Sequence, residues 1–136
     1  MTVLLVIDDE WCSRRPWLER AVSHLFPLVD YNSRVFWPRM LHAEALLALR
    51  PSTICWDNDL GYISEGEMVE TSRQLARWLR DPKVEEIAAT LCNSKHLVHS
   101  ANNVRGPEIR NLLLDFGVEG SSIVLHPITQ RFSWQS

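Results

Sequence analysis

The segment TICWDNDLG, residues 53–61, determines the expected fold. It begins with a short apolar run, residues 54–56, which ends abruptly in two carboxylates, Asp57 and Asp59, followed by Gly61. An apolar run of this length between turn-forming residues predicts a buried β-strand rather than a helix. Open α/β sheets bind their ligands at the carboxyl ends of the strands, so the two carboxylates indicate a functional site.

A second apolar run, residues 3–7, also ends in carboxylates, at residues 8–10. Carboxylates that converge from two neighbouring strands repel each other unless a proton or a metal ion neutralises them. Carboxylate oxygens, together with water and phosphate oxygens, are the usual ligands of Mg²⁺. The alternative is that these acids cap helices and turns, which Asp also favours. The expected ligands of one divalent cation, Mg²⁺ or Mn²⁺, are four aspartates: Asp8, Asp9, Asp57 and Asp59.

The composition of the chain predicts one globular domain over residues 1–136. The net charge of −3, with no run of Lys or Arg, argues against binding to duplex DNA. The first apolar run is too short for a signal peptide or a membrane span. Three cysteines without CxxC spacing argue against a disulfide framework or a zinc site, so we expect a cytoplasmic protein. The oligomeric state is not indicated.

Apolar patterns predict strands that alternate with helices along the chain. Strands are expected at residues 3–7, 31–37, 53–56, 96–100 and 122–126. Helices are expected from Pro16 to Pro27 and at residues 40–49, 68–79, 84–91 and 107–114, with loops at residues 8–16 and 61–66. Such alternation predicts an α/β fold with one doubly wound, five-stranded parallel sheet. Only nine residues follow Pro127, so the last helix is expected to be shortened or missing.

The order of these motifs resembles that of response-regulator receiver domains, which have a flavodoxin-like fold. Residues 8–10 resemble the acidic pair after the first strand of a receiver, and Asp57 stands where the phosphoacceptor aspartate would. Ser100 resembles the hydroxyl residue after the fourth strand, and His126 stands where a receiver has a lysine. An imidazole does not carry the permanent charge of that lysine.

Three segments are similar to a narrower group, the cyclic-phosphate-processing receiver-like domains. Residues 57–61 resemble their Asp-His-Asp-Leu-Gly motif, with Asn58 in place of His. Residues 99–106 resemble their His-Ser-x-Asn-Pro-x-Gly motif, and residues 8–10 their Asp-Asp-x-Arg motif, with Arg14 as a displaced candidate for the arginine. This resemblance implies a hydrolase that processes cyclic or terminal phosphates of nucleotides or RNA, in a family common on phages and mobile elements.

The expected catalytic residues are Asp57, His99, Ser100 and Asn102. His99 is the candidate general acid/base, because the pKa of a histidine ordinarily lies near neutrality; the alternative is a core histidine. Attack by Asp57 on phosphorus and attack by metal-bound water both stay open. Basic residues and the start of a helix are expected to bind phosphate oxygens: Arg14, Arg105, Gly106 and His126. The alternatives are that Arg105 is a solvated surface residue and that His126 only caps its strand.

Three functions are therefore open. The leading hypothesis is a metal-dependent phosphodiesterase that acts on a cyclic phosphate or a related nucleotide or RNA-end linkage. The second is a stand-alone receiver that a kinase partner phosphorylates on Asp57. The third is a non-catalytic module that sequesters a nucleotide. The sequence does not identify the substrate.

Overall fold

A five-stranded parallel sheet forms the centre of the protein. The structure is a computed structural model that describes residues 2–26, 30–39, 41–64, 67–100 and 103–126. The strand order is β2-β1-β3-β6-β7, and every neighbouring pair is parallel. The bounds of the strands are Val3–Ile7 for β1, Ser33–Trp37 for β2, Thr53–Trp56 for β3, Lys95–Val98 for β6 and Ile123–Leu125 for β7.

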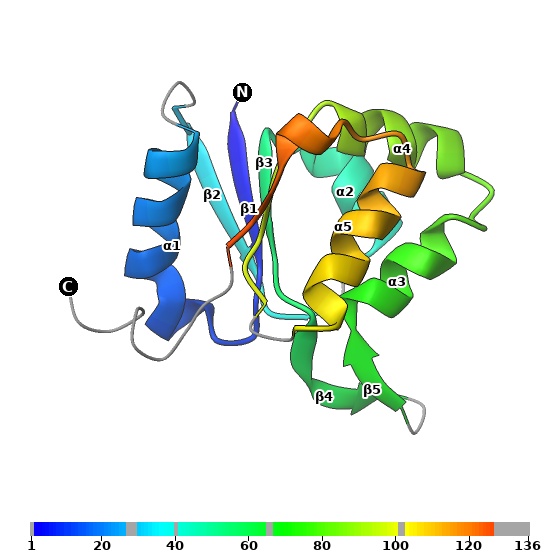
Figure 1. Ribbon diagram of the computed structural model, residues 1–136, viewed down its shortest axis with the longest axis horizontal. Coiled ribbons are helices and arrows are strands. Elements are labelled where there is room, and N and C mark those ends of the chain that lie inside the picture. Colours follow the sequence, from blue (N-terminus) through cyan, green and yellow to red (C-terminus); the bar gives the residue numbers. More distant parts are fainter. Residues whose placement is uncertain (1, 27–29, 40, 65–66, 101–102, 127–136) are drawn as a thin grey trace.

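Helices cover both faces of this sheet (Figure 1). Helix α1 (Trp11–Leu25) lies against one face. Four helices lie on the other: α2 (Ala43–Leu49), α3 (Thr71–Trp78), α4 (Val84–Cys92) and α5 (Arg105–Asp115). A single 3-10 turn, Gly120–Ser122, precedes β7. The expected doubly wound α/β fold is therefore confirmed, whereas the expected absence of the last helix concerns residues 127–136, outside the described part.

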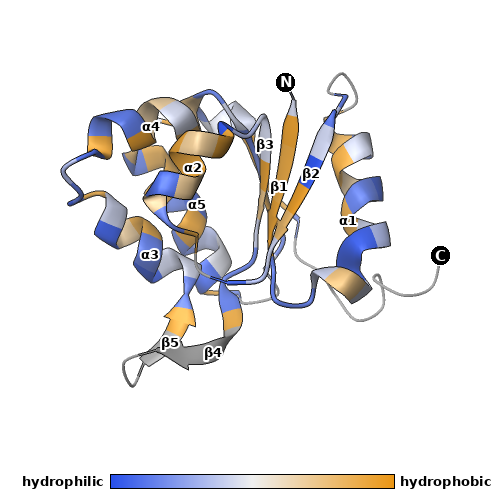
Figure 2. Cartoon of the chain, turned by 180° about the vertical axis from the view of Figure 1, so that it is seen from behind, coloured by the Kyte–Doolittle hydropathy of each residue, from blue (hydrophilic) through white to orange (hydrophobic). Residues whose placement is uncertain are grey.

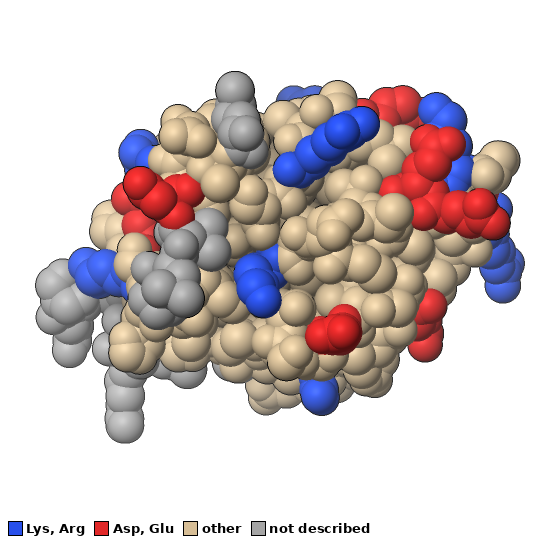
Figure 3. Space-filling model, turned by 90° about the horizontal axis from the view of Figure 1, so that it is seen from above, with Lys and Arg blue, Asp and Glu red and all other residues tan. Residues whose placement is uncertain are grey.

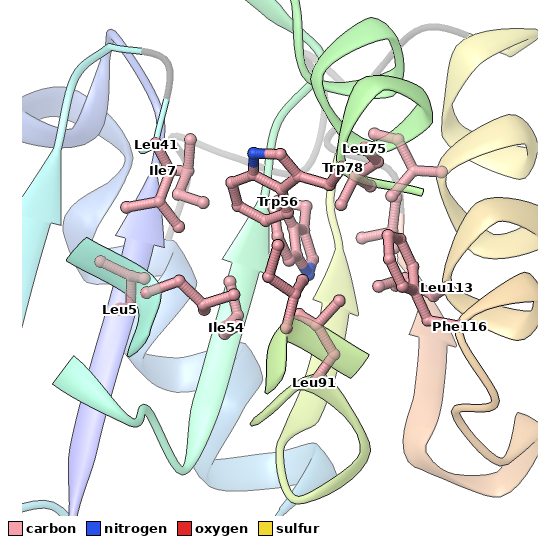
Figure 4. Close-up of a cluster of buried hydrophobic side chains, with 14 of the residues drawn as sticks. Leu5, Ile7, Leu41, Ile54, Trp56, Leu75, Trp78, Leu91, Leu113 and Phe116 are labelled. Atoms are coloured by element: carbon pink, nitrogen blue, oxygen red, sulfur yellow. The ribbon is translucent and has the colours of Figure 1, made fainter. Parts of the chain in front are cut away.

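Two hydrophobic clusters, one on each face, hold these layers together. Side chains alternate between the faces along a strand, so the fully buried β1 contributes Leu4 and Val6 to the α1 side and Leu5 and Ile7 to the other side. Figure 2 shows β1 as hydrophobic over most of its length, whereas the helices combine hydrophobic and hydrophilic residues. On the side of α2–α5, Trp56 lies among aliphatic side chains at the centre of the cluster (Figure 4).

Helix α1 begins earlier than the sequence suggested. The expected start at Pro16 is wrong: the helix begins at Trp11, because the amides of Ser13 and Arg14 already donate to the carbonyl of Glu10. Pro16 therefore lies inside the helix, where a proline ordinarily costs stability. The buried apolar stripe that follows it offsets this cost (Trp17, Leu18, Ala21 and Val22). The early start places Arg14 on the first turn of a helix rather than on a loop.

The expected loop at residues 61–66 is also wrong over residues 61–64, whereas residues 65–66 lie outside the described part. Strands β4 (Asp59–Ser64) and β5 (Glu67–Glu70) form an antiparallel hairpin, and α3 begins only at Thr71. This hairpin extends from the end of the molecule at which β1 and β3 finish (Figure 1). Gly66 between two short segments was the available signal for a hairpin.

The opposite end of the molecule, where the strands begin, is seen in Figure 3. Basic side chains are scattered there among neutral and acidic ones and form no continuous basic patch in the visible, described part. Among the described residues, none of the helices has the length and apolar character that a membrane span requires.

A buried histidine links β6 to the core. His96 is fully buried, its Nδ1 accepts a hydrogen bond from Nε1 of Trp56 at 3.0 Å, and its Nε2 donates to the carbonyl oxygen of Leu91 at 2.8 Å. Each ring nitrogen of the neutral imidazole therefore makes a hydrogen bond. Burial lowers the pKa of His96 from 6.5 to about 4.

We predict that this histidine makes the protein less stable in acid. Between pH 6.5 and pH 4 the unfolded chain binds a proton at His96 that the folded chain does not bind, so stability falls as the pH falls through this window. The total loss is about 3 kcal/mol. Urea unfolding at several pH values should show a shallower pH dependence for His96→Gln than for the wild type. The exposed His42→Gln is the control, and equal slopes for the wild type and His96→Gln would contradict the prediction.

Candidate functional site

Four polar side chains form a row just beyond the ends of the strands. The backbone ladder continues one residue past β1, β3, β6 and β7, with N–H···O distances of 2.9 to 3.1 Å. Because side chains alternate along a strand, each residue of this row points to the same face as the strand residue two positions before it, which is the α1 face. We call this set the end row: Asp8, Asp57, His99 and His126.

Asp8 is the most completely bonded member of the end row. Its side chain is fully buried, and its Oδ2 accepts a hydrogen bond from Nε2 of His99 at 2.9 Å. Nη1 of Arg14 lies 3.1 and 3.3 Å from its two oxygens, and the amide of Glu10 donates to Oδ1 at 2.8 Å. Burial by itself would raise the pKa of Asp8, but the contacts with His99, the Glu10 amide and Arg14 outweigh burial and lower it.

Asp57 lies beside Asp8 at the end of β3 and is 5% exposed. Its Oδ2 lies 3.2 Å from Nη1 of Arg14, and its Oδ1 accepts the amide of Asn58 at 3.0 Å. Its carbonyl oxygen accepts the hydroxyl of Thr71, at the start of α3. Both the side chain and the backbone of Asp57 are therefore fixed by neighbouring elements.

The surroundings of Asp57 shift its pKa upward. Burial, together with the negative charges of Asp8 and Asp9, raises the pKa of Asp57 to about 6, although His99 and Arg14 oppose the shift. The pKa of Asp8 is shifted in the opposite direction. Of the two buried carboxyl groups, Asp57 therefore has the pKa that lies closer to neutral pH.

Arg14 connects the two carboxylates to α1. Its Nη1 contacts both Asp8 and Asp57, and its Nη2 contacts Glu10, four residues earlier in the chain. The side chain is only 19% exposed. Its Nε is buried and has no hydrogen-bond partner among the described residues.

His99 follows β6 and contacts Asp8. Its ring is fully buried, and while Nε2 contacts Asp8, Nδ1 has no hydrogen-bond partner in the described part of the chain. The strand β6 ends at Val98, so the expected strand to residue 100 is too long and His99 stands just beyond it. The backbone of His99 is nevertheless held by the ladder bond to Trp56.

The carboxylates could hold a divalent cation. One oxygen from each of Asp8, Asp9 and Asp57 lies within 4.8 Å of the others, and three carboxylates suit a hard cation such as Mg²⁺. Asp9 as a residue is exposed, but its carboxyl group is partly covered by the protein, and this desolvation raises its pKa. The negative charges of Asp8 and Glu10 raise it further. Nη1 of Arg14 already lies against two of these three carboxylates, so the arginine and a cation would share the same ligands.

Asp59, the fourth expected metal ligand, lies outside this group. Its carboxylate accepts a hydrogen bond from Nδ2 of Asn58 at 3.0 Å, at the base of the β4–β5 hairpin. Asn58 points to the opposite face from Asp57, since the two are consecutive residues at a strand end. Of the four aspartates expected to act together, the structure therefore brings together Asp8, Asp9 and Asp57.

The basic residues expected to bind phosphate occupy different places. Arg14 lies against Asp8 and Asp57, which together with Asp9 we call the acidic cluster. Arg105 instead pairs with Glu70 at 3.2 Å and with Glu108 at the start of α5. The ring of His126 stacks on a tryptophan of α1, Trp17, with 5.2 Å between ring centroids. The expected basic residues therefore do not form one cluster.

The remaining expected site residues follow β6. Ser100 is buried, and Gly106 is buried in the first turn of α5. Asn102 lies outside the described residues. The expected catalytic roles of Ser100 and Asn102 stay predictions.

Asn58 is a structural residue that the sequence pattern did not reveal. Its side chain is fully buried; its Oδ1 accepts the amide of Ser72 at 3.1 Å, and its Nδ2 contacts Glu70 at 3.3 Å. These bonds connect the end of β3 to the hairpin and to α3. A single asparagine after an aspartate carries no signal for such distant partners, which only the folded chain brings together.

Comparisons with known proteins identify the fold. No protein-family model matches this chain, and the search of curated proteins found no significant match. The signal receiver domain of a DNA-binding response regulator from Colwellia psychrerythraea is similar, with a TM-score of 0.51 and 14% identity over 98% of this chain and 89% of that one. A CheY-like receiver domain from Methanospirillum hungatei has a TM-score of 0.43 and 12% identity over 96% and 86%.

The first of these similarities shows a receiver-like fold, as the sequence led us to expect. The finer resemblance to cyclic-phosphate-processing domains finds no support in either comparison. The structure and the comparisons therefore establish the fold and an acidic cluster at the ends of β1 and β3, and they leave the activity to be proposed.

We predict that Asp57 lowers the stability of the folded protein at neutral pH. Because its pKa is raised from 3.8 to about 6, the folded chain binds a proton at Asp57 more tightly than the unfolded chain does. The stability that the protonated form contributes is lost as the pH rises through 6. The cost above pH 6 is about 3 kcal/mol. In EDTA at pH 8, Asp57→Asn should therefore be more stable than the wild type in urea unfolding, and the difference should vanish below pH 4. The exposed Asp30→Asn is the control, and a less stable Asp57→Asn at pH 8 would contradict the prediction.

We also predict that Asn58→Ala destabilises the protein. The substitution leaves the buried amide of Ser72 without its acceptor, which costs about 1–3 kcal/mol. Urea unfolding measures the loss, with the exposed Asn111→Ala as the control. Equal stability of Asn58→Ala and the wild type would show that the bridge from β3 to α3 contributes nothing.

Proposed function

We propose that this chain is a receiver-type signalling domain that is phosphorylated on Asp57. The observation that carries the proposal is the position of this carboxylate at the end of the central strand β3, beside Asp8 and Arg14. In a doubly wound sheet whose order reverses between its first and third strands, ligands bind at that switch point, and these groups lie there. The receiver-like fold supports the same position for a phosphoacceptor.

The chemistry requires the ionised form of Asp57. A carboxylate oxygen attacks the phosphorus of an acyl phosphate or a phosphohistidine, a new P–O bond forms, and the leaving group departs with the electrons of the broken bond. A pKa of about 6 leaves Asp57 mostly ionised at pH 7. The Asp8 carboxylate, whose pKa is lowered, stays charged under the same conditions.

The permanent positive charge beside Asp57 comes from Arg14. A receiver has a lysine after its last strand, and this chain has His126, whose ring stacks on Trp17. The guanidinium of Arg14 approaches the carboxylate from α1, the helix that follows β1, rather than from the end of β7. The site therefore has a cation next to the expected phosphoacceptor, although a different element of the fold supplies it.

The metal-dependent phosphodiesterase suggested by the sequence stays a prediction, and we place it second. It assigns proton transfer to His99, but this ring is fully buried and its Nε2 is bonded to Asp8. A non-catalytic nucleotide-binding module is likewise a prediction. Both differ from the receiver hypothesis in that neither requires a covalent phosphoryl group on Asp57.

We predict that a small acyl phosphate labels Asp57. Acetyl phosphate should add one phosphoryl group, which intact-mass spectrometry detects, and Asp57→Ala should lose the label while the exposed Asp115→Asn keeps it. Since only the carboxylate attacks, the initial rate should be about tenfold lower at pH 5 than at pH 7, as follows from the pKa of about 6.

A panel of cyclic nucleotides and RNA 2′,3′-cyclic ends, with Mg²⁺, Mn²⁺ or EDTA, distinguishes the alternatives. Turnover that disappears in Asp57→Ala and His99→Ala, without covalent labelling, would replace the receiver proposal by the phosphodiesterase. Tight binding of a nucleotide that is recovered intact, again without labelling, would support the sequestering module.

A further inference from the structure

We infer that Arg14 takes the place of a divalent cation in the acidic cluster, so that a phosphoryl group on Asp57 is held by a guanidinium without a metal ion. The first half of this inference stands on the geometry of the acidic cluster. The second half rests on the proposed function, because it concerns the phosphorylated state of Asp57.

The position of Nη1 is the first observation. It lies 3.1 Å from Oδ2 of Asp8 and 3.2 Å from Oδ2 of Asp57, so it bridges the two buried carboxylates of the candidate metal site. A Mg²⁺ ion binds its oxygen ligands at about 2.0–2.1 Å, and an ion that bound both carboxylates would occupy the space of this nitrogen. Arg14 and a directly bound cation therefore exclude each other.

The way in which Arg14 is held is the second observation. It stands on the first turn of α1, a helix fixed to the sheet by the buried Trp17 and Leu18, and its Nη2 contacts Glu10. The backbone of the same turn is fixed by the bonds from residues 13 and 14 to the carbonyl of Glu10. A side chain that is anchored by its helix and by Glu10 loses less conformational entropy on binding than a free surface arginine does.

The charge balance of the acidic cluster is the third observation. Asp8 and Asp57 are buried, and Arg14 gives both of them a positive partner that does not lose its proton. Removal of this guanidinium would leave two buried carboxylates beside the exposed Asp9, and a cation would then be needed to neutralise them. The same three carboxylates thus form a metal site only when Arg14 is absent from it.

A phosphoryl group fits this arrangement. When an oxygen of Asp57 is phosphorylated, the carboxylate becomes an acyl phosphate and loses its own charge, and the transferred group brings new oxygens to the same place. A guanidinium is a planar fork whose donors match phosphate oxygens. Arg14 has the buried Nε–H, without a partner among the described residues, in addition to the donors that now contact the acids. Arg14 can therefore exchange its contact with the Asp57 carboxylate for hydrogen bonds to the phosphoryl oxygens.

The first experiment titrates each protein with Mg²⁺, and separately with Mn²⁺, by isothermal calorimetry. The proteins are the wild type, Arg14→Met, Arg14→Lys and the control Arg15→Met, which removes the adjacent arginine that pairs with Glu19 outside the acidic cluster. Circular dichroism verifies folding, and Arg14→Lys retains a charge if Arg14→Met does not fold. We expect the dissociation constant for Mg²⁺ to be at least tenfold lower in Arg14→Met than in the wild type and Arg15→Met, with Arg14→Lys in between.

Equal Mg²⁺ affinities in the wild type and in the folded Arg14 variants, whether strong or undetectable, would overturn the inference. Equal strong binding would show that the guanidinium does not exclude the ion. Undetectable binding in every protein would show that something other than Arg14 excludes it.

The second experiment repeats the acetyl phosphate labelling with EDTA and with Mg²⁺. We expect the wild type to be labelled at rates that agree within twofold in the two conditions. In EDTA the labelling rate of Arg14→Met should be at least tenfold lower than that of the wild type, and Mg²⁺ should restore it. Labelling of the wild type only with Mg²⁺ would overturn the inference and leave the receiver function intact. The absence of labelling in all proteins and conditions would overturn the receiver function and, with it, the phosphoryl-binding role, while the calorimetry still decides whether Arg14 excludes the ion.

Discussion

One guanidinium nitrogen shared by two buried carboxylates is the interaction on which the functional end of this protein depends. Asp8 and Asp57 come from neighbouring strands, and the parallel register places them side by side. Two negative charges in this position repel each other, and burial makes the repulsion stronger. Nη1 of Arg14 reduces that repulsion, yet burial, with the remaining repulsion from Asp8 and Asp9, keeps the pKa of Asp57 raised, so part of the electrostatic cost stays in the folded protein.

The early start of α1 is what makes this contact possible. Had the helix begun at Pro16, Arg14 would lie on a loop, without a fixed direction toward the sheet. The helical first turn aims it at the end row, and Trp17, one turn later, receives the ring of His126. A proline inside the helix is tolerated because the buried stripe that follows it holds α1 on the sheet.

Asp57 also stands at the junction between the sheet and the hairpin. Its carbonyl oxygen is bound by Thr71, and Asn58, the next residue, is bonded to Ser72 and Glu70. The two consecutive residues therefore face opposite ways: the aspartate toward the acidic cluster on the α1 side, and the asparagine toward the elements on the other side. A chemical change at Asp57 occurs within one residue of the contacts that fix the hairpin.

The sequence by itself determined the strands and the acids that follow them, because apolar runs and the turn residues after them are local features. Residues 3–7, 53–56 and 84–91 were expected close to their observed bounds, and parallel strands necessarily bring Asp8 and Asp57 to one edge. Only the tertiary structure decided the partner of those acids, since the direction of Arg14 depends on where α1 begins and on which face of the sheet it covers. It likewise decided that His96 bonds to Trp56 and that Asn58 bonds to Ser72, contacts between residues too far apart in the chain for any local pattern to specify.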